Sequence, residues 1–285
     1  MRSLYLQPHA PFGSRPVPPG VDIAGLPARV GTLTALHAEP QNALGTVLFV
    51  PGFTGSKEDF LDFVPLLAAR GWNAWAYSQR GQADSAAPAG VDSYALEKLA
   101  ADAVELAAMV SQTPVHLVGH SMGGVVAVEA AIAAPERFRS LTLLCSGPHG
   151  WPERLQETTD VISAGGSLGL WEHDNPGLLE ATDEELGSEA AFYRLRATHT
   201  SSENLLATAG ILRHHVDRSE ALRATGLPVL ITHGEDDQAW PQDWQRQMAE
   251  AIGAPYRIIP GGAHSPQRES PQATANTLDA FWRSV

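Results

Sequence analysis

The feature that most constrains this chain is an alternation of short apolar runs with longer stretches of helical periodicity. Residues 45–52, GTVLFVPG, are apolar and β-branched enough for a strand buried on both faces. Residues 57–71 follow with apolar side chains at helical spacing and end at a glycine. Such β-α-β-α order predicts an α/β fold with a doubly wound, mostly parallel sheet. Further strands are expected at 28–38, 72–78, 114–121 and 140–147, and further helices at 93–110 and 122–134.

The alternation stops between residues 148 and 225. This stretch contains no convincing strand pattern and is too long for a simple crossover, so we expect a helical cap over the carboxyl edge of the sheet. The core is then discontinuous, formed by residues 1–147 and 226–285. The first twenty residues hold five prolines and predict an irregular arm. The cap helices are expected at 152–165, 183–199 and 201–216, and the pattern resumes with strands at 227–234 and 255–262 and helices at 241–253 and 270–285.

Three polar features follow predicted strands, where active sites of parallel sheets lie. Ser121 stands in the pattern G-x-S-x-G, the pair Asp236–Asp237 follows the strand at 227–234, and His264 follows the strand at 255–262. A nucleophilic serine needs a base, and the base needs a group that fixes its tautomer and stabilises its charged form. Serine, aspartate and histidine in this chain order predict such a set, with either aspartate available from the spacing alone.

The glycines around Ser121 have a steric reason. A sharp strand-to-helix turn forces its central residue into a sparsely allowed conformation and presses the residues two positions either side together. Gly119 and Gly123 therefore need to lack side chains. The turn also exposes the serine hydroxyl at the positive end of a helix, where free N–H groups can face an oxyanion.

Four segments together make the chain resemble the α/β-hydrolase family: GHSMGG at 119–124, HGEDDQAWP at 233–241, GGAHSP at 261–266 and VPGFTGS at 50–56. The resemblance implies a Ser121 nucleophile, a His264 base and, by the family's G-x-x-D spacing, Asp237 rather than Asp236 as the acid. It also implies an oxyanion hole made by the backbone N–H groups of Phe53 and Met122. It implies no metal or organic cofactor.

Two segments depart from the family pattern. Pro51-Gly52 stands where members often carry His-Gly, so the hydrogen bonds of that histidine are absent. The segment YSQRGQADS at 77–85 resembles the family's D-x-R-G-H-G-x-S, with Ser78, Gln82 and Ala83 in place of the aspartate, the histidine and the second glycine. We expect this segment to be mainly structural.

Aromatic residues near the predicted site are candidates for the substrate pocket. They are Phe53, His120, Trp151, Trp171 and Trp240, although packing of the cap onto the core explains the tryptophans equally well. The eleven histidines include no H-E-x-x-H motif, and we predict no metal site.

Composition narrows the partners. The net charge of −13 without clustered Lys or Arg argues against nucleic acid. The single cysteine, Cys145, permits no intrachain disulfide, and no apolar run of 18 residues favours stable membrane anchoring. We therefore expect a cytoplasmic protein whose partner is a small-molecule ester, with a homodimer possible.

These observations predict a serine hydrolase of small to medium apolar carboxylic esters that works through an acyl-enzyme. Hydrolysis of lactones or carbon–carbon bonds, haloperoxidase-like perhydrolysis and acyl transfer use the same triad and stay open, because the pocket decides among them. A ligand-binding receptor of the hydrolase fold with little turnover is the alternative from another class.

Overall fold

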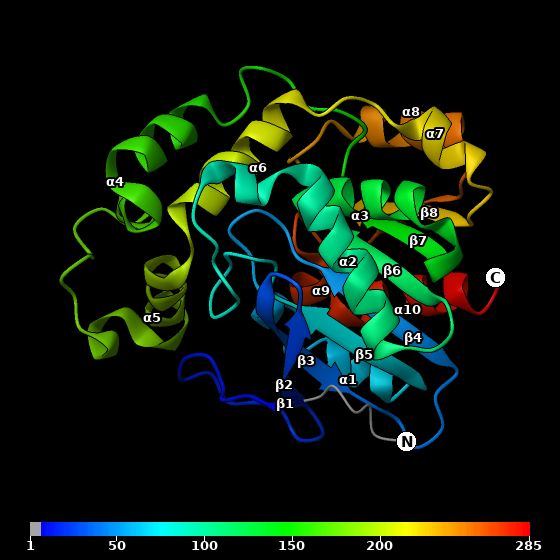
Figure 1. Cartoon of the computed structure of the whole chain (residues 1–285), viewed down its shortest axis with the longest axis horizontal. Helices are drawn as coiled ribbons and strands as arrows, with labels where there is room; N and C mark the ends of the chain where they lie inside the picture. The colour runs from blue at the N-terminus through cyan, green and yellow to red at the C-terminus, as the bar shows by residue number, and fades with distance from the viewer. Residues whose placement is uncertain (1–6) are drawn as a thin grey trace.

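The computed structural model describes residues 7–285 and contains one nine-stranded sheet in the order β1-β2-β3-β5-β4-β6-β7-β8-β9 (Figure 1). The six strands from β5 to β9 in this order are parallel to one another, whereas β1, β2 and β3 form an antiparallel edge that joins β5 through an antiparallel pair of β3 and β5. The predicted α/β fold with a mostly parallel sheet is confirmed. The strands are β1 Gln7–Pro8, β2 Asp22–Ala28, β3 Gly31–Ala38, β4 Gly45–Val50, β5 Trp72–Tyr77, β6 Val115–His120, β7 Phe138–Leu144, β8 Val229–Gly234 and β9 Tyr256–Ile259.

Helices cover both faces of this sheet. Buried side chains of α2, α3 and α8 pack on one face, and those of α1 and α10 pack on the other. The strand β4 shows why its sequence is continuously apolar: Leu48 and Val50 face the first layer, and Val47 and Phe49 face the second. The helices are α1 Val64–Ala68, α2 Leu96–Val110, α3 Met122–Ala133, α4 Gln156–Asp174, α5 Asp183–His199, α6 Ser202–His214, α7 Ser219–Ala224, α8 Gln242–Ile252, α9 Pro266–Glu269 and α10 Pro271–Trp282.

Three predicted elements differ in the structure. The strand expected at 28–38 is the second arm of a hairpin, because a turn at 29–30 joins β3 to the preceding β2. The helix expected at 57–71 is broken into a 3-10 turn, Lys57–Phe60, and α1, which has Pro65 in its first turn. The helix expected at 152–165 begins later and continues to residue 174, with a kink at Gly166, where φ is 68°.

The N-terminal arm is only partly irregular. Residues 1–6 lie outside the described residues, and Gln7–Pro8 form β1 at the sheet edge. Farther along, Phe12 packs edge-on against Phe192 of α5, with ring centroids 6.0 Å apart. The arm therefore touches both the sheet and the helices that follow β7.

The helical insertion, residues 148–225, lies between β7 and β8, and in the described residues it holds only helices, turns and loops. Figure 1 shows α4, α5 and α6 grouped beside the sheet rather than layered on its faces. Ser201 caps α6 by accepting a hydrogen bond from the N–H of Asn204. In residues 7–285 no helix has both the length and the apolarity to cross a membrane.

Candidate active site

Ser121 occupies a sharp turn between β6 and α3. Its φ of 53° and ψ of −122° are rarely adopted by residues with side chains. A Cβ at Gly119 would lie 2.4 Å from the carbonyl oxygen of Gly123, and a Cβ at Gly123 would lie 2.2 Å from that of Val50. Both glycines are therefore required by close backbone contact, and the turn holds the serine at the N-cap, directly before the first residue of a helix.

Ser121, His264 and Asp237 form one chain of hydrogen bonds. The Nε2 atom of His264 lies 3.0 Å from Oγ of Ser121, and its Nδ1 atom lies 2.9 Å from Oδ1 of Asp237. The Ser121 residue is 6% exposed and Asp237 is 1% exposed, whereas the His264 side chain is 37% exposed. This arrangement can move a proton from the serine to the imidazole while the buried carboxylate stabilises the positive charge.

The loop after β8, which carries Asp237, meets the loop after β9, which carries His264, at Gly234. A Cβ there would lie 2.1 Å from the carbonyl oxygen of Ala263, so the glycine lets the two loops approach. Burial opposes ionisation of Asp237, but hydrogen bonds from His264 and from the N–H of Ala239 outweigh it and hold the pKa of Asp237 below its ordinary value. Asp237 is therefore ionised at neutral pH. Asp236, the other aspartate that the sequence offered, is exposed.

The loop after β4 passes directly against the serine. A Cβ at Gly52 would lie 3.1 Å from Cβ of Ser121, which puts the peptide between Gly52 and Phe53 beside the reacting hydroxyl. Met122 is the first residue of α3, so its N–H has no partner within the helix. The two amides that the family resemblance implies as oxyanion donors thus flank Ser121 from two different elements.

Sequence reasoning missed two side chains that support this loop. Nε2 of Gln79 donates to the carbonyl oxygen of Pro51 at 2.9 Å, and Nε2 of Gln82 donates to that of Gly52 at 2.8 Å. Both residues belong to the segment that departs from the family pattern. The sequence signal for this contact is the glutamine at position 82, where the family pattern has a histidine.

His120 supports the histidine loop. Its Nε2 atom lies 2.6 Å from the carbonyl oxygen of His264, which makes it a hydrogen-bond donor to that backbone. His120, His264 and Cys145 also bring one potential metal-ligand atom each within 4.8 Å of one another. Both ring nitrogens of His264 are already engaged, and burial raises the pKa of the Cys145 thiol well above its ordinary value. A protonated thiol and an imidazole that is hydrogen-bonded through both nitrogens are poor metal ligands, so we assign no metal to these three side chains.

One cavity, of about 240 Å³, lies among the helices of the insertion. Its wall includes Thr54, the neighbour of Phe53, together with Leu170, Trp171 and Leu205. Half-buried Phe53 packs against the apolar cluster that contains Leu170 and Leu205. Of the predicted pocket residues, Trp171 therefore lines a cavity that adjoins the loop beside Ser121.

Trp240 packs the base of the insertion, which is one of the two roles that its place in the sequence allows. It is fully buried, and its indole N–H donates to the carbonyl oxygen of His149 at 3.2 Å. The guanidinium of Arg154 lies 3.7 Å from the centroid of its ring. Trp151 is half-buried and packs edge-on against Trp244, with ring centroids 5.5 Å apart. Both tryptophans thus join the base of the insertion to the core.

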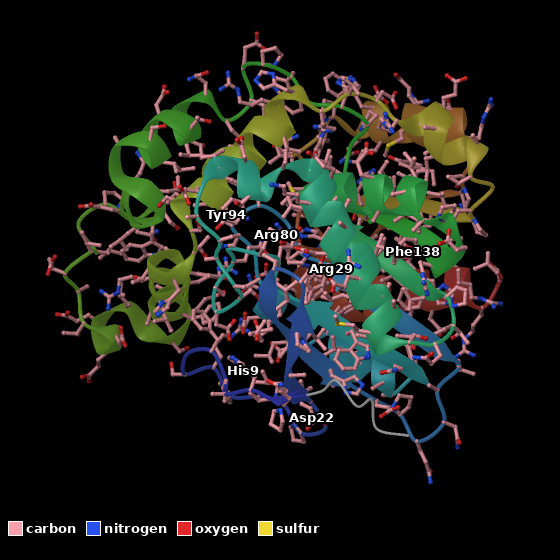
Figure 2. The ribbon with its side chains drawn as sticks, in the orientation of Figure 1. His9, Asp22, Arg29, Arg80, Tyr94 and Phe138 are labelled. Atoms are coloured by element: carbon pink, nitrogen blue, oxygen red, sulfur yellow. The ribbon has the colours of Figure 1, made fainter. Side chains whose placement is uncertain are left out.

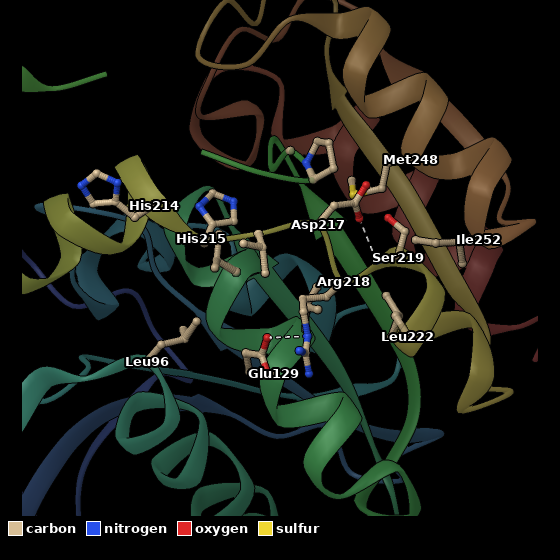
Figure 3. A pocket seen from close by; sticks show the side chains of 15 residues that line it. Leu96, Glu129, His214, His215, Asp217, Arg218, Ser219, Leu222, Met248 and Ile252 are labelled. Carbon is tan, nitrogen blue, oxygen red and sulfur yellow. Dashed lines mark hydrogen bonds and ion pairs between the residues drawn. The ribbon is translucent and has the colours of Figure 1, made fainter. Parts of the chain in front are cut away.

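A second cavity, of about 200 Å³, lies where the insertion leaves and rejoins the core (Figure 3). Aliphatic side chains such as Val128 and Leu222 line it, and an ion pair between Arg218 and Glu129, with Nε 3.1 Å from Oε1, forms part of its wall. None of Ser121, Asp237 and His264 lines either cavity, but this second cavity, unlike the first, has no wall residue from the loop after β4 beside Ser121. We do not assign it to the active site.

Three buried histidines make the stability of this fold sensitive to acid. Burial lowers the pKa of His116, His120 and His215 to about 4 each, from an ordinary value of 6.5. Between pH 6.5 and 4 the unfolded chain binds protons that the native protein does not, so the free energy of unfolding falls as the pH decreases. The slope is about 1.4 kcal/mol per pH unit for each histidine.

We therefore expect Tm, measured by circular dichroism, to fall steeply from pH 6.5 to 4.5. The variant His116→Asn removes one of the three groups and keeps a polar side chain opposite Ser140, which lies 2.8 Å from Nδ1 of His116. Its Tm should depend less steeply on pH than that of the wild type. Equal slopes for the two proteins would contradict this origin of the acid sensitivity.

The fold and this site define an α/β hydrolase, and the comparisons with known proteins agree. The model of the alpha/beta hydrolase family matches residues 47–277, so the chain belongs to that family. The match runs from within β4 to within α10 and includes the loops that carry Ser121, Asp237 and His264.

Individual relatives have diverse activities. The chain is 26% identical to "Putative carbamate hydrolase RutD" of Variovorax paradoxus, over 77% of this chain and 84% of that protein. It is 30% identical to a pimeloyl-[acyl-carrier protein] methyl ester esterase of Methylococcus capsulatus, over 59% of this chain and 70% of that protein. A crystal structure from work on carboxylesterases of Nitrososphaera gargenis superposes with a TM-score of 0.72 at 22% identity, covering 91% of this chain and 97% of that one.

Proposed function

We propose that this protein is a serine hydrolase that cleaves small to medium apolar carboxylic esters. The observation that carries the proposal is the continuous hydrogen-bonded chain from Ser121 through His264 to Asp237, with spacings of 3.0 and 2.9 Å. The strained turn at Ser121 and the loop beside it supply the rest of the machinery that ester hydrolysis needs.

The reaction proceeds in two halves. His264 Nε2 accepts the hydroxyl proton of Ser121 as Oγ attacks the ester carbonyl carbon, and the backbone N–H groups of Phe53 and Met122 stabilise the oxyanion. His264 then returns that proton to the leaving alcohol, which leaves an acyl group on Ser121. Water, deprotonated by the same imidazole, attacks the acyl carbon, and the acid departs as the proton returns to Oγ. Asp237 accepts the Nδ1–H bond throughout.

The cavity in the helical insertion is a candidate site for the acyl group, because Thr54 joins its wall to the loop beside Ser121. Leu170, Trp171 and Leu205 form an apolar side of that wall, which suits an apolar group, and Asp174, Asn175 and Arg196 belong to a polar side. Its volume of about 240 Å³ suits a short acyl chain or a single ring rather than a long-chain lipid.

A panel of p-nitrophenyl esters, lactones, thioesters and carbamates, combined with fluorophosphonate labelling, tests the proposal. We expect ester turnover, and a phosphonate adduct on the peptide that contains Ser121 by mass spectrometry. Tight binding of esters without turnover or labelling would contradict the hydrolase and indicate a receptor. The relationship to the carbamate hydrolase makes carbamate cleavage the second candidate, and it is favoured if carbamates exceed all esters in kcat/KM.

A further inference from the structure

The loop that follows β5, Gln79–Ser85, supports the candidate oxyanion hole through two buried amides. Gln79 and Gln82 are 1% and 0% exposed, and each donates one hydrogen bond to a carbonyl oxygen of the loop after β4. Gln82 contacts the carbonyl oxygen of Gly52 at 2.8 Å. The N–H of Phe53 belongs to that same peptide unit. Gln82 therefore binds the carbonyl oxygen of the peptide whose N–H is the candidate oxyanion donor.

The hydrogen bonds fix which way the Gln82 amide points. The backbone N–H of Gln79 lies 3.0 Å from Oε1 of Gln82. A backbone N–H can only donate, so the atom opposite it must be the oxygen of the amide, and Nε2 is left facing Gly52. The donor to the oxyanion-loop peptide is therefore set by chemistry and not by an arbitrary choice of rotamer.

A donor on a peptide oxygen acts on the N–H of the same unit. It polarises the peptide, which makes the N–H a stronger donor, and it holds the peptide plane at a fixed angle. Gly52 O receives a second hydrogen bond from the N–H of Gly55 at 3.2 Å. Pro51 removes the histidine that family members often place in this loop, so side chains outside the loop must orient it.

The Gln79–Ser85 loop is itself held rigidly. The N–H of Ser201, at the start of α6, donates to the carbonyl oxygen of Gly81 at 2.8 Å, and Nδ2 of Asn204 donates to that of Arg80 at 2.9 Å. The Arg80 guanidinium pairs with Asp102 through two contacts of 2.6 Å. Arg80 and Tyr94 lie between α2 and the insertion in Figure 2. Gln82 therefore projects from a braced loop.

We propose that Gln82 is a positioning residue that orients and polarises the Phe53 N–H for stabilisation of the oxyanion. The inference rests on the proposed ester hydrolysis at Ser121. It predicts that loss of the Gln82 donor weakens binding of the transition state more than binding of the substrate.

Two variants of nearly the same shape test this role. Gln82→Met removes the donor, and we expect kcat for a p-nitrophenyl ester to fall about tenfold to hundredfold, less than for loss of an oxyanion donor itself, while KM stays within about threefold. Gln82→Glu can donate only when its carboxyl is protonated. The ratio of its kcat to the wild-type kcat should therefore rise as the pH falls, and the ratio cancels any pH dependence that the two proteins share.

Ser85→Ala is the matched control. Ser85 is buried in the same loop, donates to the carbonyl oxygen of Ser78 at 2.7 Å and has no hydrogen bond to the loop after β4 among the described residues. We expect a lower Tm with kcat within about twofold of wild type. Equal losses of kcat in Ser85→Ala and Gln82→Met, or a Gln82→Glu ratio that is flat with pH, would overturn the positioning role.

Failure of the inference can be told apart from failure of the proposed function. If the wild type hydrolyses esters and its Ser121 is labelled, while Gln82→Met keeps full kcat, only the role of Gln82 is overturned. If the wild type neither turns over any ester nor reacts with the fluorophosphonate, the proposed ester hydrolysis and the positioning role of Gln82 are both contradicted.

Discussion

Ser121→Ala is expected to lower kcat for p-nitrophenyl ester hydrolysis by about 10⁶-fold, the scale of loss when a serine hydrolase loses its nucleophile. Without Oγ no acyl-enzyme can form, and His264 is left with no nucleophile 3.0 Å from its Nε2 atom. The residual rate over water would come from the oxyanion donors and binding alone.

The fold of this variant should survive. Alanine keeps the Cβ atom and therefore the same backbone strain at φ 53°, and the only side-chain hydrogen bond of Ser121 in the described residues is the one to His264. We expect Tm within a few degrees of wild type. Ser140→Ala is the control for activity and should keep full kcat. It changes another buried serine, which lies near the N-terminal end of β7 and therefore away from the carboxyl ends of the strands, where Ser121 lies. Turnover by Ser121→Ala within tenfold of wild type would remove this residue from the mechanism.

Much of the core was predictable because its signals are local. A strand buried on both faces must be continuously apolar, as β4 is, and a covering helix must repeat its apolar side chains every three or four residues. The errors arose where local patterns compete. Strand β2 was not predicted because it contains Gly25 and Pro27, which are unfavourable in strands, although it pairs along its whole length with β3. Helix α1 is separated from the preceding 3-10 turn because it has Pro65 in its first turn.

The convergence of Ser121, Asp237 and His264 was a topological prediction. Parallel strands place their carboxyl ends along one edge, so residues far apart in sequence can meet there. The hydrogen-bond distances needed coordinates. The contact of Gln82 with the loop after β4 could not be predicted, because an isolated buried amide leaves no periodic signal. The effect of such an amide depends on which carbonyl oxygen it faces, and no local pattern in the sequence specifies that oxygen. Trp240 shows the converse, since an aromatic residue next to the acid loop fits a pocket and a packed core equally well.

The second large effect is expected at Asp237. Asp237→Ala should lower kcat about 10⁴-fold, because the Nδ1–H of His264 loses its acceptor and the imidazolium loses its counter-charge. Asp236→Ala, which changes an exposed neighbour, is the matched control and should leave kcat unchanged. Loss of activity in Asp236→Ala together with its retention in Asp237→Ala would move the acid to the other aspartate.

Asp237→Asn should lose less than Asp237→Ala, for a reason specific to this site. Oδ1 of Asp237 accepts from both His264 and the N–H of Ala239, which lies 3.0 Å away. That N–H can only donate, so the oxygen of the new amide takes the Oδ1 position and keeps His264 in its working tautomer. The amide nitrogen then faces Gln245, whose Nε2 lies 3.5 Å from Oδ2 and whose Oε1 has no partner among the described residues. A flip of the Gln245 amide lets its Oε1 accept a hydrogen bond from the new amide nitrogen.

Steady-state kcat values that rank wild type, Asp237→Asn and Asp237→Ala in falling order support this orientation. An Asn variant as poor as Ala would mean that the amide turns its nitrogen to the imidazole and reverses the tautomer, which costs about 10⁴-fold in a serine protease.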